Sequence, residues 1–432
     1  MSSQNQVVTF GCRLNIYESQ IIKQNLESSG LDDVVVFNTC TVTKAAENEA
    51  IRSIKKLKKE RPDAKIIVTG CAAQVNPAKF SSLKEVDKVL GNEEKLHAEN
   101  YRFSENAHLN KALISDIMQV KEIAPHMVQN FTEHSRAFLQ IQNGCDHRCT
   151  FCIIPYGRGP SRSVPIGSIA QEIRALVENG YNEIVLTGVD VTSYGADLPG
   201  TPSFAQAIRR LLAHEPRLNR LRLASIDVAE IDEDLFDLMA YEPRLMPHFH
   251  ISLQSGDNMI LKRMKRRHNR DDVINFCTKL RSLRSDVSFG ADIIAGFPTE
   301  TDQMFENSLN LILEADLQYL HVFPYSPREG TPAARMPQVE KSIRKERAAI
   351  LRKTGAENLD KFAQKFDKKM MNILVEKGGV GRGENFLQVK VGEEEKVGKI
   401  LSARVKYDII GANEDIKLCA QNQNSHQDQI NT

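Results

Sequence analysis

Short apolar runs of β-branched residues alternate with longer segments of helical periodicity along the first part of the chain. The runs VVTF, VVVF and IIV each lead into a cysteine, and segments such as LNIYESQIIKQNLESSG and KAAENEAIRSIKKLKKE follow them. Short apolar runs of this kind predict buried strands, and the periodic segments between them predict helices. Strand and helix repeated in this order predict an α/β domain with a parallel sheet over residues 1–95.

A second series of strand and helix patterns begins at Phe138. The expected strands after the first are EIVLTGVDV, RLRLASID, HFHISLQSG, SFGADIIAGF and YLHVFPYS, with helical segments such as IAQEIRALVENG, PSFAQAIRRLLA and DDVINFCTKLRSL between them. Repeated βα units form a parallel barrel or part of one, and such barrels carry their chemistry at the strand ends. We therefore predict a central barrel domain over residues 131–366, preceded by a connector over residues 96–130.

The pattern changes again after residue 366. Short β-runs, MMNILVEK, FLQVKVG, VGKILSARVKYDIIGA and IKLCA, are broken by glycine-rich turns. They predict a small all-β barrel over residues 367–420, a fold often used on RNA. The final segment, 421–432, is polar and of low complexity, so we expect it to be disordered.

Length, composition and charge fit this division. The chain has 432 residues, 41% of them hydrophobic, which suffices for two or three separate cores. The formal net charge is only +1, so RNA binding would depend on local basic patches. The polar start MSSQNQVVTF lacks a signal-peptide pattern, and no apolar stretch reaches the length of a membrane span. We therefore expect a cytoplasmic protein without a membrane partner.

Six of the eight cysteines form two triplets, and a disulfide framework is not expected in a cytoplasmic chain. Cys145, Cys149 and Cys152, here called the loop triplet, have the spacing C-x3-C-x2-C. Three thiolates on one loop can hold three irons of a [4Fe–4S] cluster and leave the fourth iron open. The alternative is a structural zinc site with His147 as fourth ligand, although zinc usually takes paired C-x2-C or Cys/His spacings.

Cys12, Cys40 and Cys71, here called the strand-end triplet, each follow an expected strand. All strands of a parallel sheet end at the same edge, so these thiols are expected to converge and to hold a second cluster with one open iron. The alternative is three buried cysteines without a ligand role, because free cysteine is commonly buried. Cys277 and Cys419 fit that second interpretation better.

The motifs around the cysteines resemble those of the methylthiotransferases of the radical S-adenosylmethionine (SAM) superfamily. The resemblance covers nearly the whole chain and rests on GCRLNIYES, NTCTVT, GCAAQ, CTFCIIPYGRG, LTGVDV, HISLQSG, ADIIAGFPTET and HVFPYSPREGTPAARM. GCRLN and NTCTVT look most like the branch that acts on N6-threonylcarbamoyladenosine in tRNA. The isopentenyladenosine branch would favour GCQMN and NTCSIR, and the branch that modifies a ribosomal-protein aspartate would favour GCPKN.

The resemblance implies a fold, cofactors and a reaction. It implies a partial (βα)6 radical SAM barrel, a C-terminal TRAM domain of OB-like type, two [4Fe–4S] clusters and SAM. The loop triplet would hold the cluster whose reduction cleaves SAM to a 5′-deoxyadenosyl radical, with an external electron donor. The strand-end triplet would hold an auxiliary cluster that carries the sulfur. Because C2 of adenine has an unactivated C–H bond, its methylthiolation at tRNA position 37 suits a radical cofactor.

Polar and small residues at the ends of the expected barrel strands are candidates for SAM contacts. By resemblance, Asp190 would accept a hydrogen bond from the SAM amino group. Arg266 could contact the SAM carboxylate or a tRNA phosphate. Further candidates for the ribose, methionine or adenine parts are Gly188, Ser225, Asp227, Gln254 and Gly296. The alternative for the polar residues is capping of the strand ends, and for the arginine a solvated basic helix face.

Basic residues in two places are candidates for RNA contacts. Lys55, Lys56 and Lys59 lie in the helical run IRSIKKLKKERP, and Arg382 and Lys390 lie in the expected C-terminal barrel. Lysine and arginine contacts to phosphate give affinity without sequence specificity, which would suit the anticodon stem-loop of a tRNA. DNA is not an expected partner. The alternative is a solvated charged surface.

A protein of another class is also compatible with these features. A non-catalytic iron–sulfur or zinc protein that binds RNA would need only the basic residues, one metal site and the C-terminal barrel. Two clusters and reductive SAM cleavage would distinguish the enzyme from this alternative.

Overall fold

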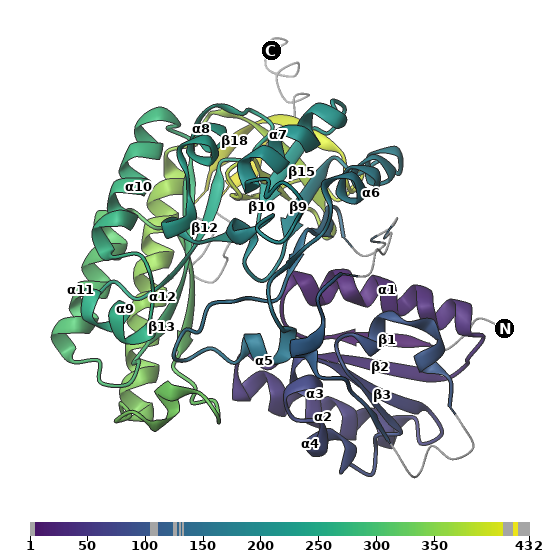
Figure 1. The fold of residues 1–432 in the computed structure, drawn as a ribbon. Coiled ribbons are helices and arrows are strands. Elements are labelled where there is room, and N and C mark those ends of the chain that lie inside the picture. The colour runs from purple at the N-terminus through teal and green to yellow at the C-terminus, as the bar shows by residue number, and fades with distance from the viewer. Residues whose placement is uncertain are drawn as a thin grey trace.

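The chain folds into two parallel α/β units and a small closed β-barrel (Figure 1). This computed structural model describes residues 5–103, 111–123, 128, 131, 134–408 and 418–421. The predicted disordered tail lies almost entirely outside these residues, as does part of the predicted connector. The mixed α/β fold class expected from the sequence is confirmed.

The N-terminal unit is a five-stranded parallel sheet in the order β1-β2-β3-β4-β5. Its strands are β1 (Gln6–Thr9), β2 (Val34–Thr39), β3 (Lys65–Gly70), β4 (Lys88–Leu90) and β5 (Ala112–Leu113). Its helices are α1 (Arg13–Ser29), α2 (Lys44–Glu60), α3 (Cys71–Val75) and α4 (Pro77–Ser81). All six residues of β2 are buried, as expected for a central strand covered on both faces.

The first sheet extends further along the chain than the pattern indicated. Strand β5 pairs in parallel with β4, so residues assigned to the connector belong to this sheet. A two-residue edge strand carries no period that a sequence pattern can reveal. The predicted domain limits otherwise stay a prediction.

The larger unit is an open barrel of parallel strands. Its strands are β6 (Ala137–Gln140), β9 (Glu183–Thr187), β10 (Arg220–Leu223), β11 (Ser225–Ile226), β12 (His248–Gln254), β13 (Ser288–Ala295) and β14 (Tyr319–Pro324). One sheet runs β10-β9-β6 and the other β11-β12-β13-β14. Only Ala224 separates β10 from β11, so the two sheets form one curved wall that is open between β6 and β14.

Helices cover the outer face of this wall. They are α6 (Ile166–Glu178), α7 (Phe204–His214), α8 (Glu233–Tyr241), α9 (Asn258–Met264), α10 (Arg270–Leu283), α11 (Asp302–Glu314) and α12 (Lys341–Gln364). Capping boxes at Ser203 and Asn269 fix the starts of α7 and α10. Helix α12 packs against β14 and was not predicted, because its charged residues obscure the apolar face. Within the described ranges, no helix combines the length and apolar character needed to cross a bilayer.

The C-terminal unit is a closed barrel in the order β15-β16-β17-β19-β18. Its strands are β15 (Met370–Glu376), β16 (Val380–Gly383), β17 (Gln388–Lys390), β18 (Ile400–Tyr407) and β19 (Leu418–Ala420). Strand β16 was missed because its sequence, VGRG, does not alternate. A Cβ at Gly381 would lie 2.4 Å from Ile373, so glycine is required where β16 pairs with β15.

A buried carboxylate joins the two barrels. Glu183 of β9 accepts two hydrogen bonds from Arg222, and its carboxylate lies 3.5 Å from Arg136 and 3.6 Å from Arg220. Arg136 in turn pairs with Glu376 of β15. Arg220 donates to the carbonyl of Asn372, also on β15. Burial opposes the charge of Glu183, but the arginines outweigh it and lower its pKa to about 2.

Replacing Glu183 by glutamine tests this link. We expect Glu183→Gln to lower the free energy of unfolding by about 3–5 kcal/mol, because buried arginines lose their shared counter-charge. The folded-state pKa lies below the ordinary 4.5, so the contribution is fully present above pH 4.5 and is lost as the pH falls through about 2. Urea unfolding curves at pH 7 and pH 3 measure the loss and its pH dependence.

Glu178→Gln is the matched control for that variant. Glu178 ends α6 and is 57% exposed beside Arg217, so its replacement should change the unfolding free energy by no more than about 0.5 kcal/mol. Equal effects of the two substitutions would contradict the proposed link.

Candidate functional site

The loop triplet lies between β7 (Gln142–Asn143) and α5 (Ile154–Arg158), at the carboxyl end of the barrel strands. Gly144 opens the loop with a φ of 75°, and a Cβ there would lie 1.8 Å from the Pro160 carbonyl oxygen. The backbone N–H of Cys145 donates to Gly159 and that of Thr150 to Met264, which ties the loop to the barrel. The position fits the rule that such barrels carry their chemistry at this end.

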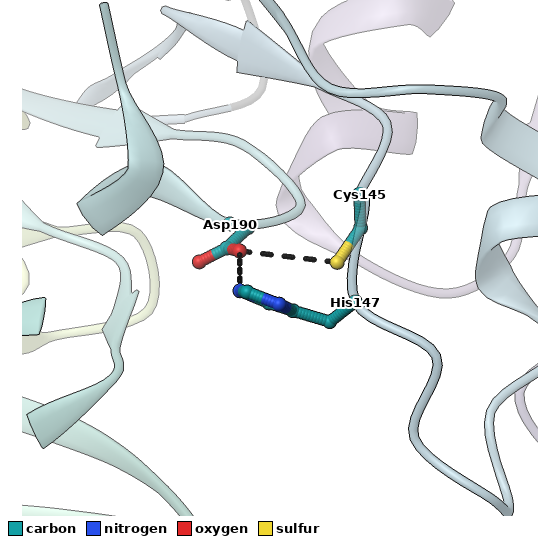
Figure 2. A group of neighbouring side chains, drawn as sticks. All are labelled: Cys145, His147 and Asp190. Atoms are coloured by element: carbon teal, nitrogen blue, oxygen red, sulfur yellow. Dashed lines mark hydrogen bonds and ion pairs between the residues drawn. The ribbon is translucent and has the colours of Figure 1, made fainter. Parts of the chain in front are cut away.

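Figure 2 shows Cys145, His147 and Asp190 pointing into one space beside the cysteine loop. Asp190 Oδ2 lies 3.0 Å from His147 Nε2 and 3.8 Å from Cys145 Sγ. Gln142 accepts hydrogen bonds from the backbone N–H groups of Val189 and Asp190, which fixes the turn after β9. The turn therefore presents the Asp190 carboxylate directly beside the loop triplet.

His147 is held by carboxylates and not by the loop triplet. Its Nε2 contacts Asp190 and lies 3.3 Å from Glu230, and these hydrogen bonds raise its pKa to about 10. Cys145, His147 and Asp190 offer ligand atoms within 4.8 Å of one another. Cys149 and Cys152 are not members of that group, so the predicted zinc alternative of three loop cysteines with His147 does not form around one ion in the described residues.

Two thiols of the loop triplet, those of Cys145 and Cys152, have raised pKa values in the absence of metal. Burial raises the pKa of Cys145 to about 12, and the charge of Asp190 adds to the rise. Burial also raises the pKa of Cys152 to about 11. A bound cation reverses this, because coordination to a metal deprotonates a thiol.

The donor set of each triplet fits an iron–sulfur cluster better than a single ion. Among the described residues, neither triplet brings its three sulfurs within 4.8 Å of one another, as one ion would require. In a cluster each thiolate binds a separate iron, so wider spacing is expected. Each triplet supplies three soft ligands, which leaves one iron of a four-iron cluster without a cysteine.

The three cysteines of the strand-end triplet follow the neighbouring strands β1, β2 and β3 of the first parallel sheet. Burial raises the pKa of Cys40 to about 12, and the neighbouring Cys71 and Cys12 raise it further. Cys12 is exposed, but desolvation by the surrounding protein groups still raises the pKa of its thiol. Gly11 has a φ of 99°, and a Cβ there would lie 2.9 Å from Cys40 Sγ. This glycine is therefore needed where the chain passes Cys40.

An arginine from the loop-triplet segment contacts the strand-end triplet. Arg158 ends α5 and donates from Nε to Cys71 Sγ at 2.9 Å. Its other nitrogens donate to both carboxylate oxygens of Glu18 and to Asn15 on α1. Lys95, fully buried, lies 2.6 Å from Glu18. The motif CTFCIIPYGRG contains Arg158, but a motif gives no indication of which distant residue its arginine contacts.

The structure distributes the other predicted SAM residues unevenly. Arg266 lies at the loop triplet, with Nη1 3.9 Å from Cys149 Sγ, and it pairs with Asp227 at 2.9 Å. Asp227 also contacts Arg267 and His268, so its carboxylate is already satisfied by protein groups. Ser225 begins β11. Their roles toward SAM stay predictions.

The predicted glycines and Gln254 serve the backbone in different ways. A Cβ at Gly296 would lie 2.3 Å from the Arg344 side chain, so this glycine makes room for α12. A Cβ at Gly188 would lie 2.8 Å from the Gln142 carbonyl oxygen. Gln254 ends β12 with a φ of 70°, where the pairing with β13 shifts register.

The predicted RNA residues do not form one surface. Lys55, Lys56 and Lys59 are exposed on α2, and Lys390 is exposed at the end of β17. Arg382 instead turns inward, with its guanidinium 4.4 Å from the Phe386 ring centre. Glu230 was missed by the sequence analysis, although it lies beside both His147 and Arg267.

Two family models match the chain. The Radical SAM superfamily model matches residues 139–312, and the model described as Uncharacterized protein family UPF0004 matches residues 4–91. The first contains the loop triplet, and the second contains the strand-end triplet. The two families thus correspond to the two parallel units.

Curated relatives resemble the chain over most of its length. It is 59% identical to the threonylcarbamoyladenosine tRNA methylthiotransferase MtaB of Rickettsia prowazekii, covering 96% of this chain and 97% of the relative. It is 36% identical to MtaB of Thermotoga maritima, covering 93% and 94%. It is 33% identical to the tRNA-2-methylthio-N(6)-dimethylallyladenosine synthase of Rickettsia prowazekii, covering 88% and 89%.

A solved structure shows the same fold. The radical S-adenosylmethionine methyltransferase TsrM from Kitasatospora setae superposes with a TM-score of 0.55 at 15% identity, covering 77% of this chain and 75% of that one. Both family models match the chain, and curated MtaB relatives match it over most of its length. The chain therefore belongs to the radical SAM methylthiotransferase family and is most like its MtaB branch.

Proposed function

We propose that this protein transfers a methylthio group to C2 of N6-threonylcarbamoyladenosine at position 37 of tRNA. The observation that carries the proposal is the pair of cysteine triplets at neighbouring strand edges, linked by Arg158. One three-cysteine site would suit many radical SAM enzymes, whereas a transferase of sulfur also needs a place to hold the sulfur. The 59% identity to an MtaB protein supports the choice of nucleoside.

Two [4Fe–4S] clusters and SAM are the proposed cofactors. The loop triplet would hold one cluster, and the strand-end triplet would hold the second. When bound, the first cluster supplies the electron that cleaves SAM reductively, and the second provides an iron site for sulfur. The reaction requires an external electron donor, and the tRNA anticodon stem-loop is the proposed partner. A cytoplasmic location remains part of this proposal.

The residues around the loop triplet have distinct proposed tasks. Asp190 lies 3.8 Å from Cys145 Sγ and would accept a hydrogen bond from the ammonium group of SAM. Arg266 lies at Cys149 and would face the SAM carboxylate. Asp227 orients Arg266 through their ion pair. Glu230 and Asp190 both contact Nε2 of His147, so they would occupy this nitrogen and keep it from acting as a cluster ligand.

Mass analysis of tRNA nucleosides from cells with and without the gene tests the reaction and the substrate together. We expect deletion to remove only the 2-methylthio form of threonylcarbamoyladenosine, with its unmethylthiolated parent accumulating. Loss of the isopentenyl counterpart would keep the reaction but change the branch. An unchanged nucleoside profile would contradict the proposal and favour a ribosomal-protein aspartate or a non-catalytic RNA-binding role.

A series of cysteine variants should distinguish the tasks of the two triplets. We expect Cys149→Ala to abolish both SAM cleavage and methylthiolation, and Cys12→Ala to abolish methylthiolation while sparing SAM cleavage under reduction. Anaerobically reconstituted proteins are assayed for iron, for the adenosyl product of SAM and for the methylthiolated nucleoside. Cys277→Ala, at a buried cysteine of α10, is the control that should keep both activities. Loss of SAM cleavage in Cys12→Ala would refute this division of tasks.

The lysines of α2 are proposed to bind tRNA phosphates. Replacing Lys55, Lys56 and Lys59 together by glutamine should weaken tRNA binding and flatten its salt dependence, by about 0.9 in log–log slope for each phosphate that is no longer neutralised. Filter binding across a salt series measures the slope. Lys341, Lys345 and Lys353, also exposed but on α12, provide a matched triple control. Equal slopes in the two triple variants would show that α2 is not part of the RNA-binding surface.

A further inference from the structure

A basic pocket lies where α1, the open barrel and the C-terminal barrel meet. Its lining includes Arg13, Arg136, Arg222, Arg382, Glu376 and Phe386. Arg13 comes from the first unit, Arg136 and Arg222 from the second, and the remaining three from the third. The pocket exists only because all three units pack together, and none of the predicted SAM residues lines it.

Positive charge in this pocket exceeds the negative charge that faces it. Glu183 lies behind it, hydrogen-bonded to Arg222 and also in reach of Arg136 and Arg220. Glu376 is shared between Arg136 and Arg382. Three guanidinium groups, those of Arg136, Arg222 and Arg382, also lie within 5.4 Å of the Phe386 ring centre. Two carboxylates therefore serve four arginines before Arg13 is considered.

Arg13 has no partner of its own in the part of the chain that the structure describes. It makes neither a hydrogen bond nor an ion pair there, although it is only partly exposed. The guanidinium of Arg222 is the charged group that acts on it most strongly, and the two repel. Asp292 and Glu183 attract it only from beyond ion-pair distance. An arginine held in a pocket beside another arginine indicates an anionic ligand.

The location of Arg13 indicates which part of the substrate carries that anion. It directly follows Cys12 and begins α1, so it lies beside the strand-end triplet. Its other neighbours, Asp292 of β13 and Arg222 of β10, belong to the barrel wall. Enzymes that act on a base draw it out of the stack into a pocket, while phosphates remain on the protein surface. An anionic group carried by the base itself is therefore the better fit.

We propose that this pocket binds the carboxylate of the threonylcarbamoyl group, with Arg13 as its direct hydrogen-bond donor. The inference rests on the proposed function and adds how the substrate is recognised. A guanidinium matches a carboxylate with two parallel N–H donors, which gives orientation as well as affinity. An isopentenyl group offers no charge, so the unpaired Arg13 would stay desolvated beside Arg222 and the wrong substrate would be disfavoured.

The test combines one protein change with one substrate change. Anticodon stem-loops carrying threonylcarbamoyladenosine, or its carboxamide in which the carboxylate is replaced by a neutral amide, are given to the wild type and to Arg13→Gln. We expect the wild type to favour the carboxylate by roughly 10- to 150-fold in kcat/KM, as for a hydrogen bond to a charged group. In Arg13→Gln this preference should fall close to one, and Arg13→Lys should restore part of it.

Measurements of binding and stability test the same proposal without requiring turnover. The affinity of each stem-loop, measured without reductant, should show the same preference in the wild type and its loss in Arg13→Gln. Arg209→Gln, at an exposed arginine of α7, should leave the preference unchanged. Because Arg13 makes no ion pair in the described structure, the melting temperature of Arg13→Gln should match the wild type.

The other outcomes are distinguishable. A wild type that binds and modifies both stem-loops equally would overturn the carboxylate proposal but keep the proposed function. Equal losses with both stem-loops in Arg13→Gln would also overturn it and assign the arginine to a tRNA phosphate. A wild type that is active in SAM cleavage but modifies neither stem-loop would instead refute the proposed function.

Discussion

The contact of Arg158 with Cys71 and Glu18 is the interaction on which the arrangement of the two cysteine sites depends. Arg158 ends the short helix that follows the loop triplet, and Glu18 lies on α1, 140 residues earlier. One guanidinium group therefore fixes the distance between a loop of the barrel and the carboxyl edge of the first sheet. Since Arg158 and Glu18 are both almost fully buried, their charges depend on one another rather than on water for stabilisation.

More than one ion pair balances the charges in this buried cluster. Burial opposes the charge of Glu18, yet Arg158 and Lys95 together hold its pKa below the ordinary value. Asn92 accepts a hydrogen bond from Lys95 at 2.7 Å and donates to the carbonyl of Gly157, so the network returns to the segment that carries Arg158. A network closed in this way specifies one arrangement of the two units, because any other would leave charges without partners.

A second set of charges lies where the C-terminal barrel packs against the open barrel. Glu183 neutralises the arginines where the C-terminal barrel packs, and this docking completes the pocket that Arg13 enters from the first unit. The two networks differ in their charge balance. Around Glu18 the cations have carboxylate or sulfur partners, whereas around Glu183 a positive excess remains for a ligand. The same physical rule, that buried charges need partners, thus explains the stability of one site and the proposed binding role of the other.

The sequence by itself determined the strand and helix order of the two parallel units, the barrel at the C-terminal end, and the two cysteine triplets. These follow from local periodicity and from the rule that parallel strands end at one edge, which is why three cysteines from distant segments could be expected to meet. It also indicated the family, through motifs that lie within single segments. The short strands β5 and β16 were missed because they carry little period, and the long helix α12 was missed because its charged residues obscure the apolar face.

Only the tertiary structure decided the partners of the charged side chains. It placed Arg158 on Cys71, turned Arg382 inward onto Phe386, paired His147 with two carboxylates and left Arg13 without a partner among the described residues. A charged side chain finds its partner through the packing of whole units, and partners that are distant in sequence leave no local pattern to read. The sequence therefore determines which chemistry this protein can hold, and the packing of its three units determines where each charge acts.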